Sequence, residues 1–425
     1  MTGRKAARFD MAIAGGGPAG AVAACLLARA GARVALVEGG RAPDRLEGLS
    51  PRLMEILAGL NLPREGVGPA APRKAAWGAL PAAPNREHVV DRRAFDAALR
   101  AAAADAGAHL VAGAVARAEA GRIRLADGRE VEAGLVFEAR GRRAPAGPRR
   151  LRGPATVAIA GWTGAAGEGG AIEAKAEGWV WRAANVAGGW TQIVADAEEA
   201  KAGAAALWAR LTDAPFPERP LIRAAEPRLL APRLDPALPR LGDAAAAMDP
   251  LSGHGLFWAV SSALAAQPLA RALLDGEVAL AARFHEARIA AAFFRQARIG
   301  RDFHRLSGFG GPFWAARAAF PDDLPAHGAG PERPRLRRQV VVRDGRLAEA
   351  LALVTARDPE GVAFFGAVEI APALARLGPG PLPPEAGFAR ALPEAPPAAA
   401  SAFRTFLLHR GVETAALPID TEAHP

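Results

Sequence analysis

The chain has 425 residues, of which 51% are hydrophobic and 23% are charged, so it is expected to fold into two or three domains and not to be intrinsically disordered. The net charge of +9 favours acidic partners, but no basic run interleaved with aromatic residues indicates a nucleic-acid partner. The single cysteine, Cys25, excludes an intrachain disulfide and a cysteine-cluster metal site, and no metal-ligand spacing occurs elsewhere in the sequence.

The first predicted unit is a strand, a glycine-rich turn, a helix and a second strand. Residues 9–14 predict a buried strand, residues 18–30 an Ala- and Leu-rich helix, and residues 33–38 a second strand. Glycines and a proline interrupt this apolar run too often for it to span a membrane. We therefore expect a soluble cytoplasmic protein, without a membrane partner, that begins with a βαβ unit.

The turn of this unit carries Gly15, Gly17 and Gly20 in the frame G-x-G-x-x-G. In this frame the first glycine allows a tight turn, the second lets the backbone approach a pyrophosphate, and the third lets helix and strand pack closely. The helix that follows offers free N–H groups and a positive dipole end to phosphates. Glu38 closes the second strand, where a carboxylate accepts hydrogen bonds from an unphosphorylated ribose. The predicted dinucleotide contacts are Gly15, Gly17, Pro18, Ala19, Gly20 and Glu38.

A segment further along resembles a motif of FAD-dependent monooxygenases. Residues 90–99 read VDRRAFDAAL, which is similar to the V-D-R-x-x-F-D-x-x-L segment of that family. In the family the arginine of this segment lies against the phosphate and flavin side of FAD, and Arg92 is the matching residue. The resemblance therefore implies that the dinucleotide is FAD.

A second FAD motif is matched in residues 241–255, which read LGDAAAAMDPLSGHG and resemble the family's G-D-A-A-x-x-x-x-P-x-x-G-x-G. In physical terms, a strand that ends at Gly242 would present Asp243 to the ribityl hydroxyls. Gly253 and Gly255 would then open a helix whose N–H groups face the flavin edge where negative charge gathers on reduction. The FAD contacts that this motif adds are Asp243, Pro250, Gly253 and Gly255.

Two shorter segments resemble the tryptophan halogenases and their relatives. Residues 45–51, RLEGLSP, are similar to their R-x-G-E-S-x-x-P segment, and residues 178–182, GWVWR, are similar to the G-W-x-W-x-I-P segment of halogenases and geranylgeranyl reductases. Ala183 and Ala184 replace the Ile-Pro pair, and the chain is shorter than a typical halogenase. This combination resembles the halogenase-like monooxygenases that hydroxylate a Trp side chain of a peptide or protein during maturation of a tryptophan-derived quinone cofactor.

The resemblance implies an FAD-dependent monooxygenase that hydroxylates an electron-rich aromatic ring through a C4a-hydroperoxyflavin. It implies an aromatic substrate, a peptide or protein Trp among the options, and reducing equivalents from NAD(P)H directly or through a flavin reductase. Candidate catalytic residues are Lys74, about where halogenases carry the lysine that meets hypohalous acid, and His254, which the glycine motif places near the flavin. Trp179 and Trp181 are candidates for the substrate pocket.

Three alternatives stay open at this point. A flavin-dependent halogenase would need halide and Lys74. A prenyl-chain reductase of the geranylgeranyl type is favoured by Trp179 and Trp181 but not by the missing Ile-Pro pair. A non-catalytic flavoprotein would serve as a binding module for a partner. The sequence does not indicate the oligomeric state.

The expected fold is of mixed α/β and α+β class, with a Rossmann-type FAD-binding domain, an antiparallel substrate sheet and a small helical C-terminal module. Residues 256–274 predict one long helix, and residues 339–377 show helical periodicity before a last helix near 402–409. The C-terminal module would either cover the substrate sheet or dock a protein partner. The expected bounds are 1–155 with 225–320 for the FAD-binding domain, 156–224 with part of 70–90 for the sheet, and 335–425 for the module.

Overall fold

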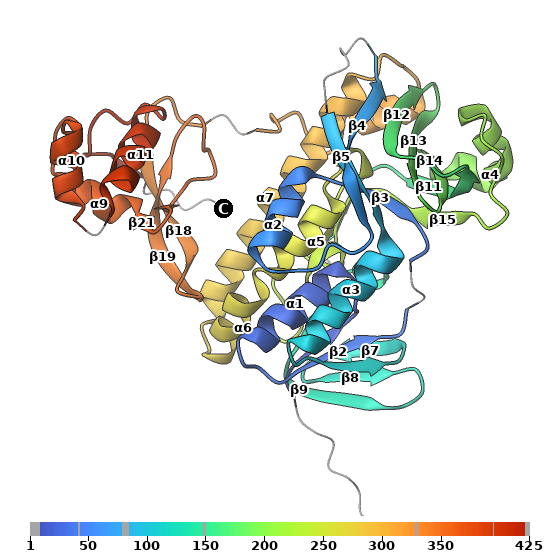
Figure 1. The fold of residues 1–425 in the computed structure, drawn as a ribbon, viewed down its shortest axis with the longest axis horizontal. Helices are drawn as coiled ribbons and strands as arrows, with labels where there is room; N and C mark the ends of the chain where they lie inside the picture. Colours follow the sequence, from blue (N-terminus) through green and yellow to red (C-terminus); the bar gives the residue numbers. More distant parts are fainter. Residues whose placement is uncertain are drawn as a thin grey trace, which may run out of the picture. The chain divides into compact units, whose positions relative to one another are not determined.

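The computed structural model describes residues 9–40, 43–78, 85–147, 150–327, 330–393 and 395–420. The chain divides into two compact units, the first made of residues 1–278 and 285–326, and the second of residues 279–284 and 327–425. The first unit holds the glycine-rich turn and two large sheets (Figure 1).

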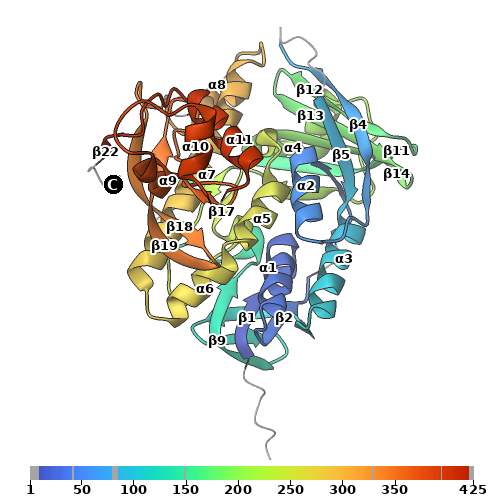
Figure 2. The ribbon, with the colours of Figure 1, turned by 60° about the vertical axis from the view of Figure 1, so that its left-hand side comes forward.

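The first large sheet contains the βαβ unit that the sequence predicts. Its six strands run in the order β6-β2-β1-β9-β8-β7, and β1 pairs in parallel with β2 and β9. Helix α1 (Pro18–Arg29) connects β1 to β2 and lies beside α3 (Arg92–Asp105) in Figures 1 and 2. Asp91 caps α3 by accepting hydrogen bonds from the N–H groups of Arg93 and Ala94. The strands are β1 Phe9–Ala14, β2 Val34–Glu38, β6 His109–Ala112, β7 Val115–Glu119, β8 Arg122–Leu125 and β9 Glu130–Glu138.

The second large sheet has eight strands in the order β15-β11-β14-β13-β12-β4-β5-β3, and all neighbours pair antiparallel except β12 with β4. The alternating segment 156–196 supplies β11 to β14, as predicted. One face packs on helix α4 (Ala197–Leu211) through Ile159, Val180 and Ile193. The other face, called the ceiling below, carries buried tryptophans. The strands are β3 Leu46–Leu49, β4 Val67–Ala76, β5 Asn85–Asp91, β11 Thr156–Gly164, β12 Gly169–Lys175, β13 Gly178–Asn185, β14 Gly188–Asp196 and β15 Leu221–Ala224.

Two predicted elements of the first unit differ in the structure. The strand expected to end at Gly242 is a single β-bridge at Arg240, because Gly242 has a φ of +56° and begins a 3-10 turn. The long helix expected over 256–274 is split, because Pro268 cannot donate a hydrogen bond to the carbonyl of Leu264. The remaining elements are α2 Pro51–Gly59, η1 Gly141–Arg143, β10 Leu151–Arg152, β16 Arg228–Leu229, η2 Gly242–Ala244, β17 Ala246–Ala247, η3 Pro250–Ser252, α5 Gly255–Ala263, α6 Ala266–Leu274, α7 Val278–Arg305 and α8 Pro312–Ala318.

The C-terminal unit carries helices, as expected, but also a long hairpin. The helical periodicity predicted over residues 339–377 is wrong up to residue 369, and only α9 (Ile370–Leu377) is helical in this range. β18 (Arg335–Arg343) instead pairs antiparallel with β19 (Arg346–Val354). Asp344 and Gly345 join them with φ values of +50° and +70°, which suit the tight turn that Asp-Gly favours. The other elements of this unit are β20 Phe364–Phe365, β21 Val368–Glu369, α9 Ile370–Leu377, α10 Glu385–Ala391, α11 Pro397–Leu408 and β22 Ile419–Asp420.

Candidate active site

A cavity of about 1280 Å³ opens at the carboxyl ends of β1 and β2 and extends to the ceiling. Gly15 and Glu38 line it at the strand ends, and Trp179 and Trp181 line it on the ceiling. The ends of parallel strands next to a glycine turn are where open α/β sheets bind nucleotides. The cavity is larger than the roughly 300–1,000 Å³ of most small-molecule sites, so it has room for a dinucleotide and a second molecule.

The three glycines of the turn have the geometry that pyrophosphate binding requires. Gly15 has a φ of +112°, which favours glycine, and a Cβ atom on Gly20 would lie 1.9 Å from the carbonyl oxygen of Gly15. Gly20 therefore allows strand and helix to pack closely. At Gly17 a Cβ atom would meet nothing within 4 Å, so the backbone is open toward the cavity. Helix α1 begins at Pro18 without a side-chain cap, which leaves its first N–H groups free for an anion.

Glu38 stands at the end of β2 and lines the cavity. Its carboxylate accepts a hydrogen bond of 2.7 Å from the N–H of Gly16 and one of 2.5 Å from the N–H of Gly40. These bonds hold the side chain beside the glycine turn, where a ribose diol could donate to the remaining lone pairs. The arrangement fits the adenosine end of a dinucleotide.

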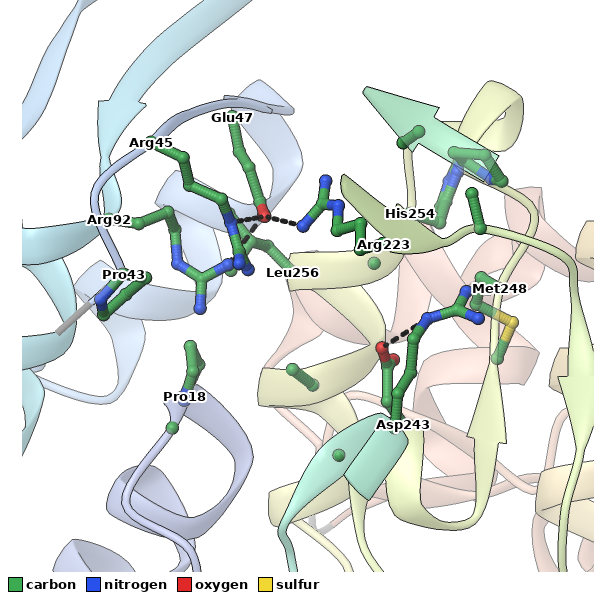
Figure 3. A pocket seen from close by; sticks show the side chains of 18 of the residues that line it. Pro18, Pro43, Arg45, Glu47, Arg92, Arg223, Asp243, Met248, His254 and Leu256 are labelled. Carbon is green, nitrogen blue, oxygen red and sulfur yellow. Dashed lines mark hydrogen bonds and ion pairs between the residues drawn. The ribbon is translucent and has the colours of Figure 1, made fainter. Parts of the chain in front are cut away.

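Arg92 is the buried member of a partly buried ionic cluster that faces the cavity (Figure 3). Glu47 accepts hydrogen bonds of 2.6 Å from Arg45 and 2.8 Å from Arg92, and Arg223 lies 3.7 Å from the same carboxylate. Arg92 is also paired with Asp96 through two bonds of 2.9 and 3.0 Å. Burial lowers the pKa of Arg45 to about 10, against the opposing charge of Glu47. Burial alone would raise the pKa of Glu47, but the three arginines outweigh it and hold that pKa well below its usual value.

Asp243 stands opposite this cluster, in the 3-10 turn η2 (Figure 3). Its carboxylate lies 3.7 Å from Arg142, and burial raises its pKa. Pro250, Gly253 and Gly255 also line the cavity, and α5 begins at Gly255, as the motif predicts. Cβ atoms on either glycine would meet nothing within 4 Å. The backbone at the start of α5 is therefore open to the cavity.

The charges along the cavity favour an anionic ligand. Arginines outnumber acidic residues in its lining, so a ligand with two phosphates would relieve an excess of positive charge. The arginines are Arg45, Arg73, Arg86, Arg92, Arg100, Arg140, Arg142, Arg143, Arg223 and Arg228, and the acidic residues are Glu38, Glu47, Glu87, Asp96 and Asp243.

Of the two candidate catalytic residues, the structure brings His254 to the cavity but not Lys74. His254 is half-buried, its Nδ1 contacts the carbonyl of Ser252, and burial lowers its pKa. Lys74 is exposed and outside the cavity lining, whereas its neighbour Arg73 lines it. Successive residues of a strand point to opposite faces, and the register of β4 on β12 puts Lys74 on the face away from the ceiling. This geometry does not favour Lys74 as the lysine that meets hypohalous acid in a halogenase.

Sequence reasoning missed part of the site. Glu47 lies in segment 45–51, which resembles a halogenase motif. The motif draws attention to this segment but does not predict that Glu47 pairs with arginines. Arg142 and Arg223 come from η1 and β15, where no local pattern sets them apart from the many other arginines. Among the described residues, no three His, Cys, Asp or Glu side chains come together as a possible metal site.

The comparisons with known proteins agree with this geometry. A family model described as an FAD binding domain matches residues 8–144. A solved structure, the peptidyl tryptophan dihydroxylase QhpG, essential for tryptophylquinone cofactor biogenesis, is 35% identical to this chain, with 95% of this chain and 100% of that chain covered and a TM-score of 0.77. This chain belongs to the family of halogenase-like FAD-dependent monooxygenases. FAD is its cofactor, and it is an oxidoreductase.

Halogenases share the fold of this monooxygenase family at lower identity. The flavin-dependent halogenase CmlS is 18% identical, with 98% of this chain and 99% of that chain covered and a TM-score of 0.68. The myxobacterial chondrochloren halogenase CndH is 22% identical, with 73% and 85% covered and a TM-score of 0.53. No curated protein matches the sequence.

In the part of the chain that the structure describes, none of the helices combines the length and the apolar character needed to cross a membrane.

Proposed function

We propose that this monooxygenase hydroxylates the indole ring of a Trp side chain within a peptide or protein. The observation that carries the proposal is the 35% identity to a peptidyl tryptophan dihydroxylase over nearly the whole of both chains. The cavity supports it, because its lining continues from the glycine turn to the ceiling, where it includes the indole rings of Trp179 and Trp181 and the aliphatic side chain of Ile172. An apolar ceiling of this kind suits a flat aromatic ring.

The chain's own residues would bind FAD along one side of the cavity. The glycine turn and the start of α1 would hold the pyrophosphate, Glu38 the adenosine ribose, Arg92 the phosphate side, and Asp243 the ribityl chain. Pro250, Gly253 and Gly255 would place the start of α5 at the flavin. When bound and reduced, FAD supplies the reaction with oxygen, and the protein supplies orientation and a site shielded from water.

His254 is the protein group that we propose for proton transfer near the flavin. It lies directly before α5, lines the cavity and is held by the carbonyl of Ser252. Burial lowers its pKa, so the imidazole is neutral at neutral pH and able to accept a proton.

We further propose that electrons come from NAD(P)H, either directly or through a flavin reductase. Anaerobic reduction of the bound flavin by NAD(P)H alone would distinguish the two routes.

The test is the mass of the product. FAD-loaded enzyme is supplied with NAD(P)H, a flavin reductase and oxygen, and is given a Trp-containing peptide, the same peptide with Phe in place of Trp, or free tryptophan. We expect the Trp peptide alone to gain the mass of one or two oxygen atoms. Oxygenation of free tryptophan but not of the peptide would contradict a macromolecular substrate. Addition of chlorine or bromine in halide buffer would contradict hydroxylation.

A further inference from the structure

Glu87 places a carboxylate on the ceiling of the cavity. It belongs to β5 and is paired with Ala71 of β4, so it points to the same face as Arg73 and Trp181. Its side chain is only 9% exposed, yet it lines the cavity. It has no part in the FAD contacts proposed above.

The neighbouring strands leave room for this carboxylate by carrying glycines. A Cβ atom on Gly170 of β12 would lie 2.1 Å from Oε1 of Glu87, and one on Gly48 of β3 would lie 2.7 Å from Oε2. Real Cβ atoms do not approach other atoms this closely. The carboxylate therefore lies in the space beside these two glycines, and a Cβ atom at either position would displace it.

The carboxylate is buried but has few partners. Trp181 donates from Nε1 to Oε1 at 3.3 Å, and Nη1 of Arg73 lies 3.7 Å from Oε2. Within the described ranges no other hydrogen bond reaches this carboxylate, whereas a carboxylate offers about four acceptor positions. Glu47, by comparison, has three arginines around it. Glu87 thus retains acceptor capacity next to the cavity.

We propose that Glu87 accepts a hydrogen bond from the ring N–H of the substrate and so fixes the orientation of the indole under the ceiling. The proposal rests on the proposed function, since it takes the substrate to be an indole. Trp179, Trp181 and Ile172 can contact the faces and edges of such a ring, but they offer no acceptor. A buried N–H without an acceptor is costly, so a charged acceptor at one place on the ceiling selects one orientation of the ring.

The charge state of Glu87 gives the contact a dependence on pH. Burial raises the pKa of Glu87, and Arg73 and the hydrogen bond from Trp181 lower it in part. Arg73 of β4 is the charged group that faces the carboxylate, while β3, β12 and β13 present Gly48, Gly170 and Trp181. The ionised form is the stronger acceptor. Binding of an N–H ring should therefore weaken as the pH falls through the raised pKa.

The experiment measures binding to the FAD-loaded protein and needs no turnover. Calorimetry compares a Trp peptide with the same peptide carrying N-methylated Trp, and indole with N-methylindole. We expect wild type to bind each N–H probe about tenfold or more tightly than its methylated partner. Glu87→Gln, which keeps the size and a neutral acceptor, should reduce this preference and remove its pH dependence, and Glu87→Leu should abolish the preference. Both variants should retain wild-type FAD content.

The matched control is Glu173→Gln on β12, which points to the other face, where it pairs with Lys175 and Arg182. It should keep the wild-type preference. Equal affinity of wild type for indole and N-methylindole, or an unchanged preference in Glu87→Leu, would overturn the role of Glu87. If the indole pair shows the preference but neither peptide binds, the Glu87 contact stands and the peptide substrate fails.

Discussion

Replacing Glu47 with Gln should destabilise the FAD-free protein while leaving FAD binding intact. The change keeps the shape of the side chain but removes the negative charge from between three arginines. Arg45 and Arg92 donate to this carboxylate at 2.6 and 2.8 Å, and Arg223 lies at 3.7 Å. Among the described residues, the pair between Arg92 and Asp96 is then the one ion pair that these three guanidinium groups would keep.

The size of the effect follows from burial. Removing one partner of a buried ion pair costs roughly 3–5 kcal/mol because the other charge stays buried without compensation. The side chains of Glu47 and Arg45 are 21% and 22% exposed, so water can reach them and the lower end, about 3 kcal/mol, is expected. For a domain of this size that corresponds to a fall in melting temperature of about 6 °C. FAD affinity should be unchanged or higher, because the site that receives the phosphates becomes more positive.

The pH dependence has a definite sign. The pKa of Glu47 is lower in the folded protein than its ordinary value of 4.5. A depressed carboxyl pKa contributes stability that is present above the unfolded value and is lost as the pH falls through the folded value. The difference between wild type and Glu47→Gln should therefore be full at neutral pH and shrink as the solution is acidified below about pH 4.5.

The assay is thermal unfolding of apo and FAD-loaded protein, followed by circular dichroism, with FAD affinity from the quenching of flavin fluorescence. Glu173→Gln is the control, because its ion pairs are about one-third exposed and such surface pairs contribute about 1 kcal/mol or less. A Glu47→Gln variant that melts like wild type without FAD would refute the reasoning. So would a variant that is equally stable but no longer binds FAD.

Three further variants test the assignments at the cavity. Glu38→Ala should weaken FAD binding by roughly 1.5–3 kcal/mol, because hydrogen bonds to a charged acceptor are lost. The affinity is measured by equilibrium titration with FAD, and an unchanged affinity would contradict a contact between Glu38 and the ribose. Asp243→Ala should lose FAD affinity or correct flavin placement while its circular dichroism stays native, and unchanged FAD content together with unchanged turnover would refute this contact. Lys74→Ala should keep FAD and substantial oxygenation, since Lys74 points away from the ceiling. An inactive but FAD-loaded Lys74→Ala variant, together with a halogenated wild-type product, would instead support a halogenase.

Features that depend on residues close together in the chain can be predicted from the sequence. The βαβ unit follows from apolar runs and from glycines at the turn, where Gly15 needs a positive φ and Gly20 allows no Cβ atom. The start of α5 at Gly255 follows in the same way from a local motif. The turn at Asp344 and Gly345 is also a local signal, because Asp-Gly between two apolar runs favours a tight hairpin turn, whereas hydrophobic spacing alone predicts a helix there.

Contacts between side chains that are far apart in the sequence become visible only in the folded chain. Glu47 lies beside arginines from three separate parts of the chain, although β3, which carries it, and β15, which carries Arg223, are the opposite edges of the eight-stranded sheet. Asp243 in η2 likewise faces Arg142 in η1, about 100 residues away in the sequence. The register of β4 decides that Arg73 and not Lys74 points to the cavity, since a shift of one residue would exchange their faces. Sheet order and register arise from pairing between segments far apart in sequence, so no local pattern specifies them.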